Sequence, residues 1–95
     1  MNAKVNVRLL GVLRGVSGRS RITVEIEHPT IGKVLQALMD SMPPEAKQLV
    51  DPEIRDPRPD TIILVNGKEI SVLKGLETEV KEEDEIVLIP VSHGG

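Results

Sequence analysis

The chain ends in Gly94 and Gly95, the two residues whose type and position could most directly support chemistry. Glycine lacks a Cβ and tolerates most backbone angles, so two in succession make a thin thread that can enter a narrow enzyme channel. The terminal carboxylate is ionised at neutral pH and is therefore a poor electrophile, so it needs activation, most simply as an acyl adenylate made with ATP. We predict that the carboxylate of Gly95, presented by Gly94, is the reactive group. The alternative is a frayed end that happens to be glycine.

The body that carries this tail is a small domain without aromatic residues. The chain has 95 residues and contains no Phe, Trp, Tyr or Cys. Its core must therefore be built from Val, Ile, Leu, Ala and Met, without disulfides, and this composition fits a reducing cytoplasm. We expect one domain over residues 1–91 and a flexible tail over residues 92–95.

Composition also argues against several classes of function. A net charge of −3 and the lack of aromatic side chains give no reason to expect direct nucleic-acid binding. The two histidines, His28 and His93, are far apart and no cysteine is present, so no metal site is predicted. No apolar run is long enough to span a membrane. The glycines at 11, 15 and 18 lack the ending of a phosphate loop, so we expect no cofactor bound by the chain itself, and ATP only through a partner.

The first half of the sequence predicts a hairpin followed by a helix. Residues 4–12 and 21–27 alternate between apolar and polar side chains, as half-buried strands do. The glycine-rich segment between them is interpreted as a turn, with no helix. Thr30 is a good N-cap, and apolar residues recur at helical spacing through about Ser41.

The second half predicts three more strands. Two prolines, Pro43 and Pro44, end the helix and can start a short turn over 45–50, and residues 51–60 are expected to form a surface loop. Residues 61–65 and 68–72 flank an Asn-Gly turn and should pair, and the apolar segment 85–91 is expected to be a central strand.

This element order matches the β-grasp architecture. The predicted fold is α+β and ubiquitin-like, with a mixed sheet of four or five strands wrapped on one main helix and the first and last strands parallel. The helix covers one sheet face only. If Ile86 and Leu88 point inward, then Val87 and Ile89 point outward, so we predict an exposed apolar, partner-binding patch beside the tail that also includes Val91.

The last third of the chain resembles the molybdopterin synthase small subunit and thiamine sulfur-carrier family. The resemblance is carried by the segments 62–70, 76–78, 84–87 and 90–91 and by the closing Gly94-Gly95. The His93-Gly94-Gly95 ending is also similar to that of ubiquitin-related modifiers.

The resemblance implies a carrier protein or non-catalytic synthase subunit. A ubiquitin-activating-type enzyme would adenylate Gly95, and a persulfide donor would convert it to a thiocarboxylate for molybdopterin biosynthesis. The sulfur acceptor would be a larger synthase-type subunit or another acceptor enzyme, and His93 would contact the activating enzyme's channel. Three alternatives stay open: a ubiquitin-like protein modifier, a sulfur carrier for tRNA thiolation, and a passive β-grasp interaction module. A stand-alone enzyme has little support, since no nucleophile-base pair is evident.

Overall fold

The computed structural model describes residues 2–41 and 61–90, which form a five-stranded mixed sheet with a helix against one face. The strands are β1 (Asn2–Leu9), β2 (Arg21–Glu27), β3 (Thr61–Val65), β4 (Lys68–Glu69) and β5 (Ile86–Pro90). Their order across the sheet is β2-β1-β5-β3-β4, with β1 and β5 parallel and the other pairs antiparallel. The predicted β-grasp fold, with its parallel first and last strands, is confirmed.

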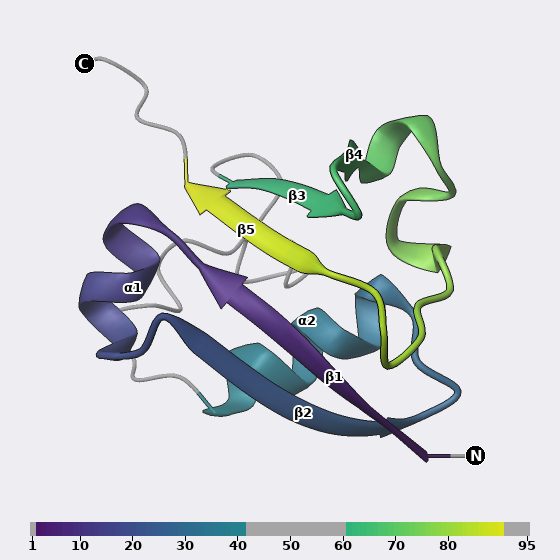
Figure 1. Cartoon of the computed structure of the whole chain (residues 1–95), viewed down its shortest axis with the longest axis horizontal. Helices are drawn as coiled ribbons and strands as arrows, with labels where there is room; N and C mark the ends of the chain where they lie inside the picture. The colour runs from purple at the N-terminus through teal and green to yellow at the C-terminus, as the bar shows by residue number, and fades with distance from the viewer. Residues whose placement is uncertain (1, 42–60, 91–95) are drawn as a thin grey trace.

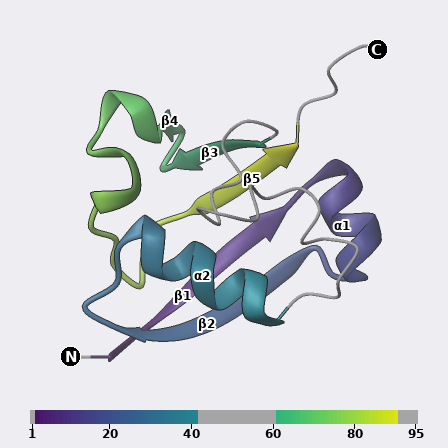
Figure 2. The ribbon, with the colours of Figure 1, turned by 180° about the vertical axis from the view of Figure 1, so that it is seen from behind.

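Helix α2 (Ile31–Ser41) covers the inner face of this sheet, as Figure 2 shows from behind. The predicted cap is present, because Thr30 Oγ1 accepts a hydrogen bond from the Lys33 backbone N–H at 3.3 Å. The inward side chains of the strands and of α2 meet in a core made of aliphatic residues and Met39. Its fully buried members include Val5, Val7, Leu9, Leu35, Leu38, Ile63, Ile86 and Leu88.

The glycine-rich segment between β1 and β2 is a helix, so the prediction of a turn without a helix was wrong. Helix α1 (Gly11–Ser17) follows β1 directly, which also makes that strand end at Leu9 instead of residue 12. Leu13 is buried at 1% exposure, and Gly18, at φ 74°, closes the helix by donating its N–H to the Arg14 carbonyl. Tertiary burial of Leu13 thus outweighs the poor helix propensity of an interior glycine.

The second hairpin is shorter than predicted. Residues 68–72 were expected to form one strand, but β4 ends at Glu69 and the 3₁₀ turn η1 (Ile70–Val72) follows. The Glu69 side chain accepts from the Ser71 backbone N–H at 2.6 Å, and Ile70 turns inward to full burial. A second 3₁₀ turn, η2 (Gly75–Glu77), continues toward β5.

Some expectations lie outside the described residues. These are the helix stop at Pro43 and Pro44, the short turn over 45–50, the loop over 51–60, and the tail from residue 91. In the described part of the chain, no helix is both long and apolar enough to cross a membrane.

Candidate functional site

The predicted reactive tail follows strand β5 in the chain. Val91, His93, Gly94 and Gly95 lie outside the described residues, and Pro90 is the last residue of β5. β5 occupies the centre of the sheet between β1 and β3, as Figure 1 shows. The chain after Pro90 therefore continues from the central strand of the sheet.

Both neighbours pair with residues 86–88 of β5, and β3 alone pairs with Ile89 and Pro90. On one side Leu88 is the register partner of Leu9, and the Leu88 carbonyl accepts from the Leu10 backbone N–H at 3.1 Å. On the other side β3 pairs antiparallel with β5, from Val65 opposite Ile86 to Thr61 opposite Pro90. Residues paired on both sides open only with the global fold, so the first three residues of β5 are held firmly, and Pro90 is held through β3.

The outer face of the sheet carries a contiguous apolar patch on two neighbouring strands. The register places Ile62 opposite Ile89 and Leu64 opposite Val87, and all four side chains lie on the face away from the core. We call this set, Ile62, Leu64, Val87 and Ile89, the outer patch. Ile62 is 38% exposed, and Leu64 and Ile89 are half-buried.

Exposure within the outer patch differs from what the alternation predicts. Val87 was expected to be exposed, but its exposure is only 8%. The reason is its central position, because the longer side chains of Arg8 and Leu64 stand at its register positions on the two adjacent strands. Ile62, which was not selected from the sequence, is the outer-patch residue most open to a partner. The available signal was the unbroken apolar run over residues 62–65, which, like the run over 86–89, places apolar side chains on both faces of the sheet.

A group of arginines on β1, β2 and the α1 region was also missed by sequence reasoning. Arg8 and Arg21 are register partners on β1 and β2, and Arg14 and Arg19 lie on and just after α1. We call Arg8, Arg14, Arg19 and Arg21 the arginine surface; all four residues are exposed. Alternation along β1 and β2 could have placed Arg8 and Arg21 together, but Arg14 joins them only because α1 exists.

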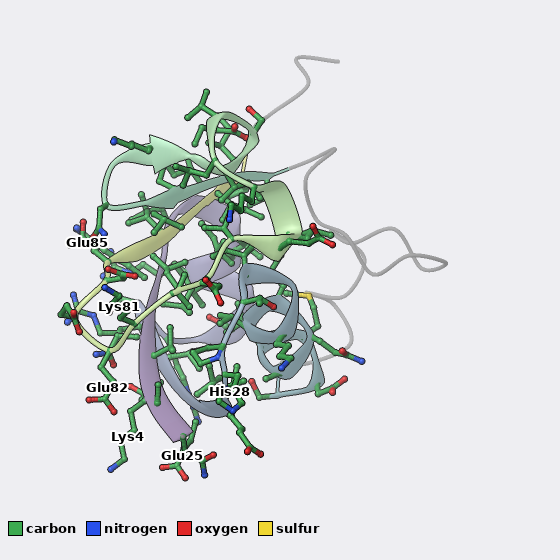
Figure 3. All side chains as sticks on the ribbon, turned by 90° about the vertical axis from the view of Figure 1, so that its right-hand side faces the viewer. Lys4, Glu25, His28, Lys81, Glu82 and Glu85 are labelled. Carbon is green, nitrogen blue, oxygen red and sulfur yellow. The ribbon has the colours of Figure 1, made fainter. Side chains whose placement is uncertain are left out.

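The opposite end of β5 is acidic. The turn over residues 81–85 precedes the strand and is closed by Asp84, whose Oδ2 accepts from the Lys81 backbone N–H at 2.8 Å. Glu82 reaches β1, where its Oε1 accepts from the Lys4 backbone N–H at 3.1 Å. Lys4, Glu25 and Glu82 gather at this end in Figure 3. Among the described residues, no group of three His, Cys, Asp or Glu side chains could hold a metal ion.

A ubiquitin-like β-grasp body with a central last strand leading into a diglycine tail defines the class of small sulfur carriers and ubiquitin-like modifiers. The comparison with family models agrees. The chain belongs to the ThiS family, whose model matches residues 7–95. A search of curated proteins found no match.

Solved structures similar to this chain belong to the same class. The solution structure of small archaeal modifier protein 1 from Methanosarcina acetivorans is 30% identical, with a TM-score of 0.80, covering 100% of this chain and 99% of that one. A chain in the crystal structure of the Amycolatopsis orientalis BexX/CysO complex is 25% identical, with a TM-score of 0.70, covering 96% and 99%. SAMP1 from Haloferax volcanii, at 22% identity and a TM-score of 0.81 over 98% and 100%, shares the fold.

Proposed function

We propose that the protein is a sulfur carrier whose Gly95 carboxylate is adenylated by a ubiquitin-activating-type enzyme and then converted to a thiocarboxylate. The observation that carries this proposal is the extent of the ThiS family match, which runs through Gly95. The central placement of β5 supports it, because a rigid strand next to the tail gives an enzyme a fixed body to hold.

In the proposed reaction, Gly95 is converted to the thiocarboxylate in three steps. A carboxylate oxygen of Gly95 attacks the α-phosphorus of ATP, and pyrophosphate leaves. A donor persulfide then attacks the acyl carbon, AMP leaves, and an acyl disulfide forms. A thiol of the donor attacks the donor's own sulfur in that disulfide, which releases the thiocarboxylate and leaves the donor oxidised. The thiocarboxylate is a better nucleophile than the original carboxylate and can deliver its sulfur to an activated precursor.

In this proposal the chain supplies recognition and presentation, and the partners supply catalysis. The outer patch binds the activating enzyme and later a larger synthase-type subunit, with Val91 and His93 extending the contact along the tail. The aliphatic surface of Ile62, Leu64 and Ile89 suits this role, since it combines partial exposure with a rigid sheet backbone. We propose molybdopterin biosynthesis as the pathway, with tRNA thiolation as an alternative acceptor.

The test is activation by the host's own enzyme. With that enzyme and ATP, the full chain should support ATP–pyrophosphate exchange, and a persulfide donor should then increase its intact mass by the difference between sulfur and oxygen. Deletion of Gly95 should abolish both, whereas the distant substitution Lys68→Gln should change neither. Exchange that survives the deletion would refute the proposal. If changes in the outer patch abolished partner binding while the deletion had no effect, a passive interaction module would be the better reading.

Protein modification is a second candidate, favoured by the 30% identity to an archaeal small modifier protein. In this case a lysine amine attacks the activated acyl carbon and an isopeptide bond forms. Trypsin cleaves after Lys81 and finds no Lys or Arg beyond it, so a modified lysine would carry residues 82–95. A reaction with host lysate can be analysed by peptide mass spectrometry for lysines that carry residues 82–95. The presence of such lysines in wild type, and their loss in the Gly95 deletion, would support the modifier function.

A further inference from the structure

Two adjoining hollows lie within the arginine surface. One, of about 540 Å³, is lined by Gly11, Arg14, Gly15, Gly18, Arg19 and Ser20. The other, of about 440 Å³, is lined by Arg8, Leu9, Leu10, Arg14, Ser20 and Arg21. They share Arg14 and Ser20, so they form a continuous depression that runs from the outer sheet face onto α1.

These hollows concentrate positive charge, although Arg8 and Arg21 also line a smaller hollow with Glu82, Glu83, Asp84 and Glu85. Their lining includes four arginines and no carboxylate. None of the four forms an ion pair with a described residue, whereas elsewhere His28 lies 3.9 Å from Glu27. Arg8 and Arg21 even face each other across the β1–β2 ladder, an arrangement that like charges disfavour. An anion bound between them would remove this repulsion.

The glycines leave the larger hollow open. A Cβ added at Gly15 or at Gly18 would meet no atom within 4 Å. Planar guanidinium groups at the rim of an open depression can approach carboxylates side-on with two parallel hydrogen bonds each. The depression is therefore suited to oxyanions that arrive from outside.

Helix α1, which carries Arg14, begins beside the end of β5. The first residue of α1, Gly11, is close to the end of β5, since a Cβ built on it would lie 3.1 Å from the Pro90 side chain. A protein that contacts Pro90 therefore also comes close to α1. Arg8 is also the register partner of Val87, so the arginine surface and the outer patch adjoin.

Protein carboxylates fit this surface better than a nucleic acid does. A third hollow, of about 150 Å³, continues from Arg8 and Arg21 to Glu82, Glu83 and Glu85. An extended polyanion that followed the surface would meet these carboxylates, and the chain has no aromatic side chain on which bases could stack. A compact acidic patch centred on Arg14 and Arg19 would occupy the two larger hollows without entering the third.

We infer that Arg8, Arg14, Arg19 and Arg21 form a docking surface for an acidic patch of Asp and Glu side chains on the activating enzyme. The inference rests on the proposed function. The arginines would steer the enzyme to the tail side of a chain whose net charge is −3, and the outer patch would complete the contact.

A direct binding experiment does not depend on activation. The ¹⁵N-labelled full chain is titrated with an oligoglutamate peptide, and separately with an RNA oligonucleotide of equal charge, at low and at high salt. The peptide should shift the Nε–Hε resonances of Arg14 and Arg19 and the amide of Ser20, and high salt should reverse the shifts. The variant Arg14→Gln/Arg19→Gln should lose this response, and the matched variant Lys68→Gln/Lys74→Gln should keep it. Shifts that spread over all cationic residues, or no shifts, would overturn the inference, and tighter binding of RNA would replace it with a nucleic-acid surface.

The functional experiment measures the exchange reaction with the activating enzyme. Arg14→Gln/Arg19→Gln should lower kcat/KM for the chain by about tenfold at low salt and by less at high salt, mainly through KM. Gly15→Gln, which fills the hollow and keeps every arginine, should also raise KM, while Lys68→Gln/Lys74→Gln should remain within about twofold of wild type. Equal values for the arginine and lysine variants would overturn the inference. Exchange that survives deletion of Gly95 would refute the proposed function, whereas exchange that is lost on that deletion but unaffected by Arg14→Gln/Arg19→Gln would overturn only this inference, so the two failures are distinguishable.

Discussion

Asn66 is clamped to Glu85 by two hydrogen bonds: its Oδ1 accepts from the Glu85 backbone N–H at 2.9 Å, and its own backbone N–H donates to the Glu85 carbonyl at 2.8 Å. Its Nδ2 also donates to Asp84 Oδ1 at 3.0 Å. The tight turn between β3 and β4 therefore holds the residues that enter β5. A turn recognisable from sequence thus helps to fix the strand that leads to the tail.

Removing the Asn66 side chain should destabilise the fold. Asn66 has a φ of 52°, which glycine adopts without strain and alanine does not. Asn66→Gly loses only the side-chain hydrogen bonds and should lower the free energy of unfolding by about 1–2 kcal/mol, and Asn66→Ala by about 1 kcal/mol more. Urea denaturation measures both. An Asn66→Gly variant as stable as wild type would show that the side-chain bonds contribute nothing.

The fold should tolerate a charged side chain at Ile62 of the outer patch but not at Val87. Ile62→Asp should lower stability by less than about 1 kcal/mol, because Ile62 is 38% exposed, yet it should weaken binding of the activating enzyme. Val87→Asp places a carboxylate at a site only 8% exposed and should cost about 3 kcal/mol or more. Thermal unfolding together with a binding titration separates the two effects. Similar melting temperatures for both variants would contradict the burial difference.

Two glycines of the α1 region should respond to alanine in opposite directions. Gly15 lies inside α1 with open space around it, so Gly15→Ala should raise the free energy of unfolding by about 0.4–1 kcal/mol. Gly18 has a φ of 74°, so Gly18→Ala should lower it by about 1 kcal/mol although the space is equally open. Urea denaturation of the pair tests whether the segment is helical in solution. Destabilisation by Gly15→Ala would argue for a non-helical turn.

The Thr61 hydroxyl group should be dispensable for stability. Thr61 is 2% exposed, and its Oγ1 has no hydrogen-bond partner among residues 2–41 and 61–90. Thr61→Val keeps the shape and removes the unsatisfied polar atom, so it should raise the free energy of unfolding by about 1 kcal/mol. Differential scanning calorimetry provides the measurement. A lower melting temperature would mean that the hydroxyl group does find a partner.

Local sequence patterns were sufficient for most of the sheet and for α2. Alternation placed Val5, Val7 and Leu9 in the core, and the Asn-Gly pair located the hairpin turn. The apolar segment before the tail indicated a central strand, and β5 is central. Such features are decided by side-chain periodicity and by turn geometry, both of which act over a few residues.

The sequence by itself determined the β-grasp order, the aliphatic core and the strand that leads to Gly94 and Gly95. Only the tertiary structure decided that residues 11–17 are helical, that Val87 is covered by its neighbours, and that Arg8, Arg14, Arg19 and Arg21 line two adjoining hollows. Burial and convergence depend on strand register and on packing between segments distant in sequence. Local propensity carries no information about either, and in the case of α1 it pointed the other way.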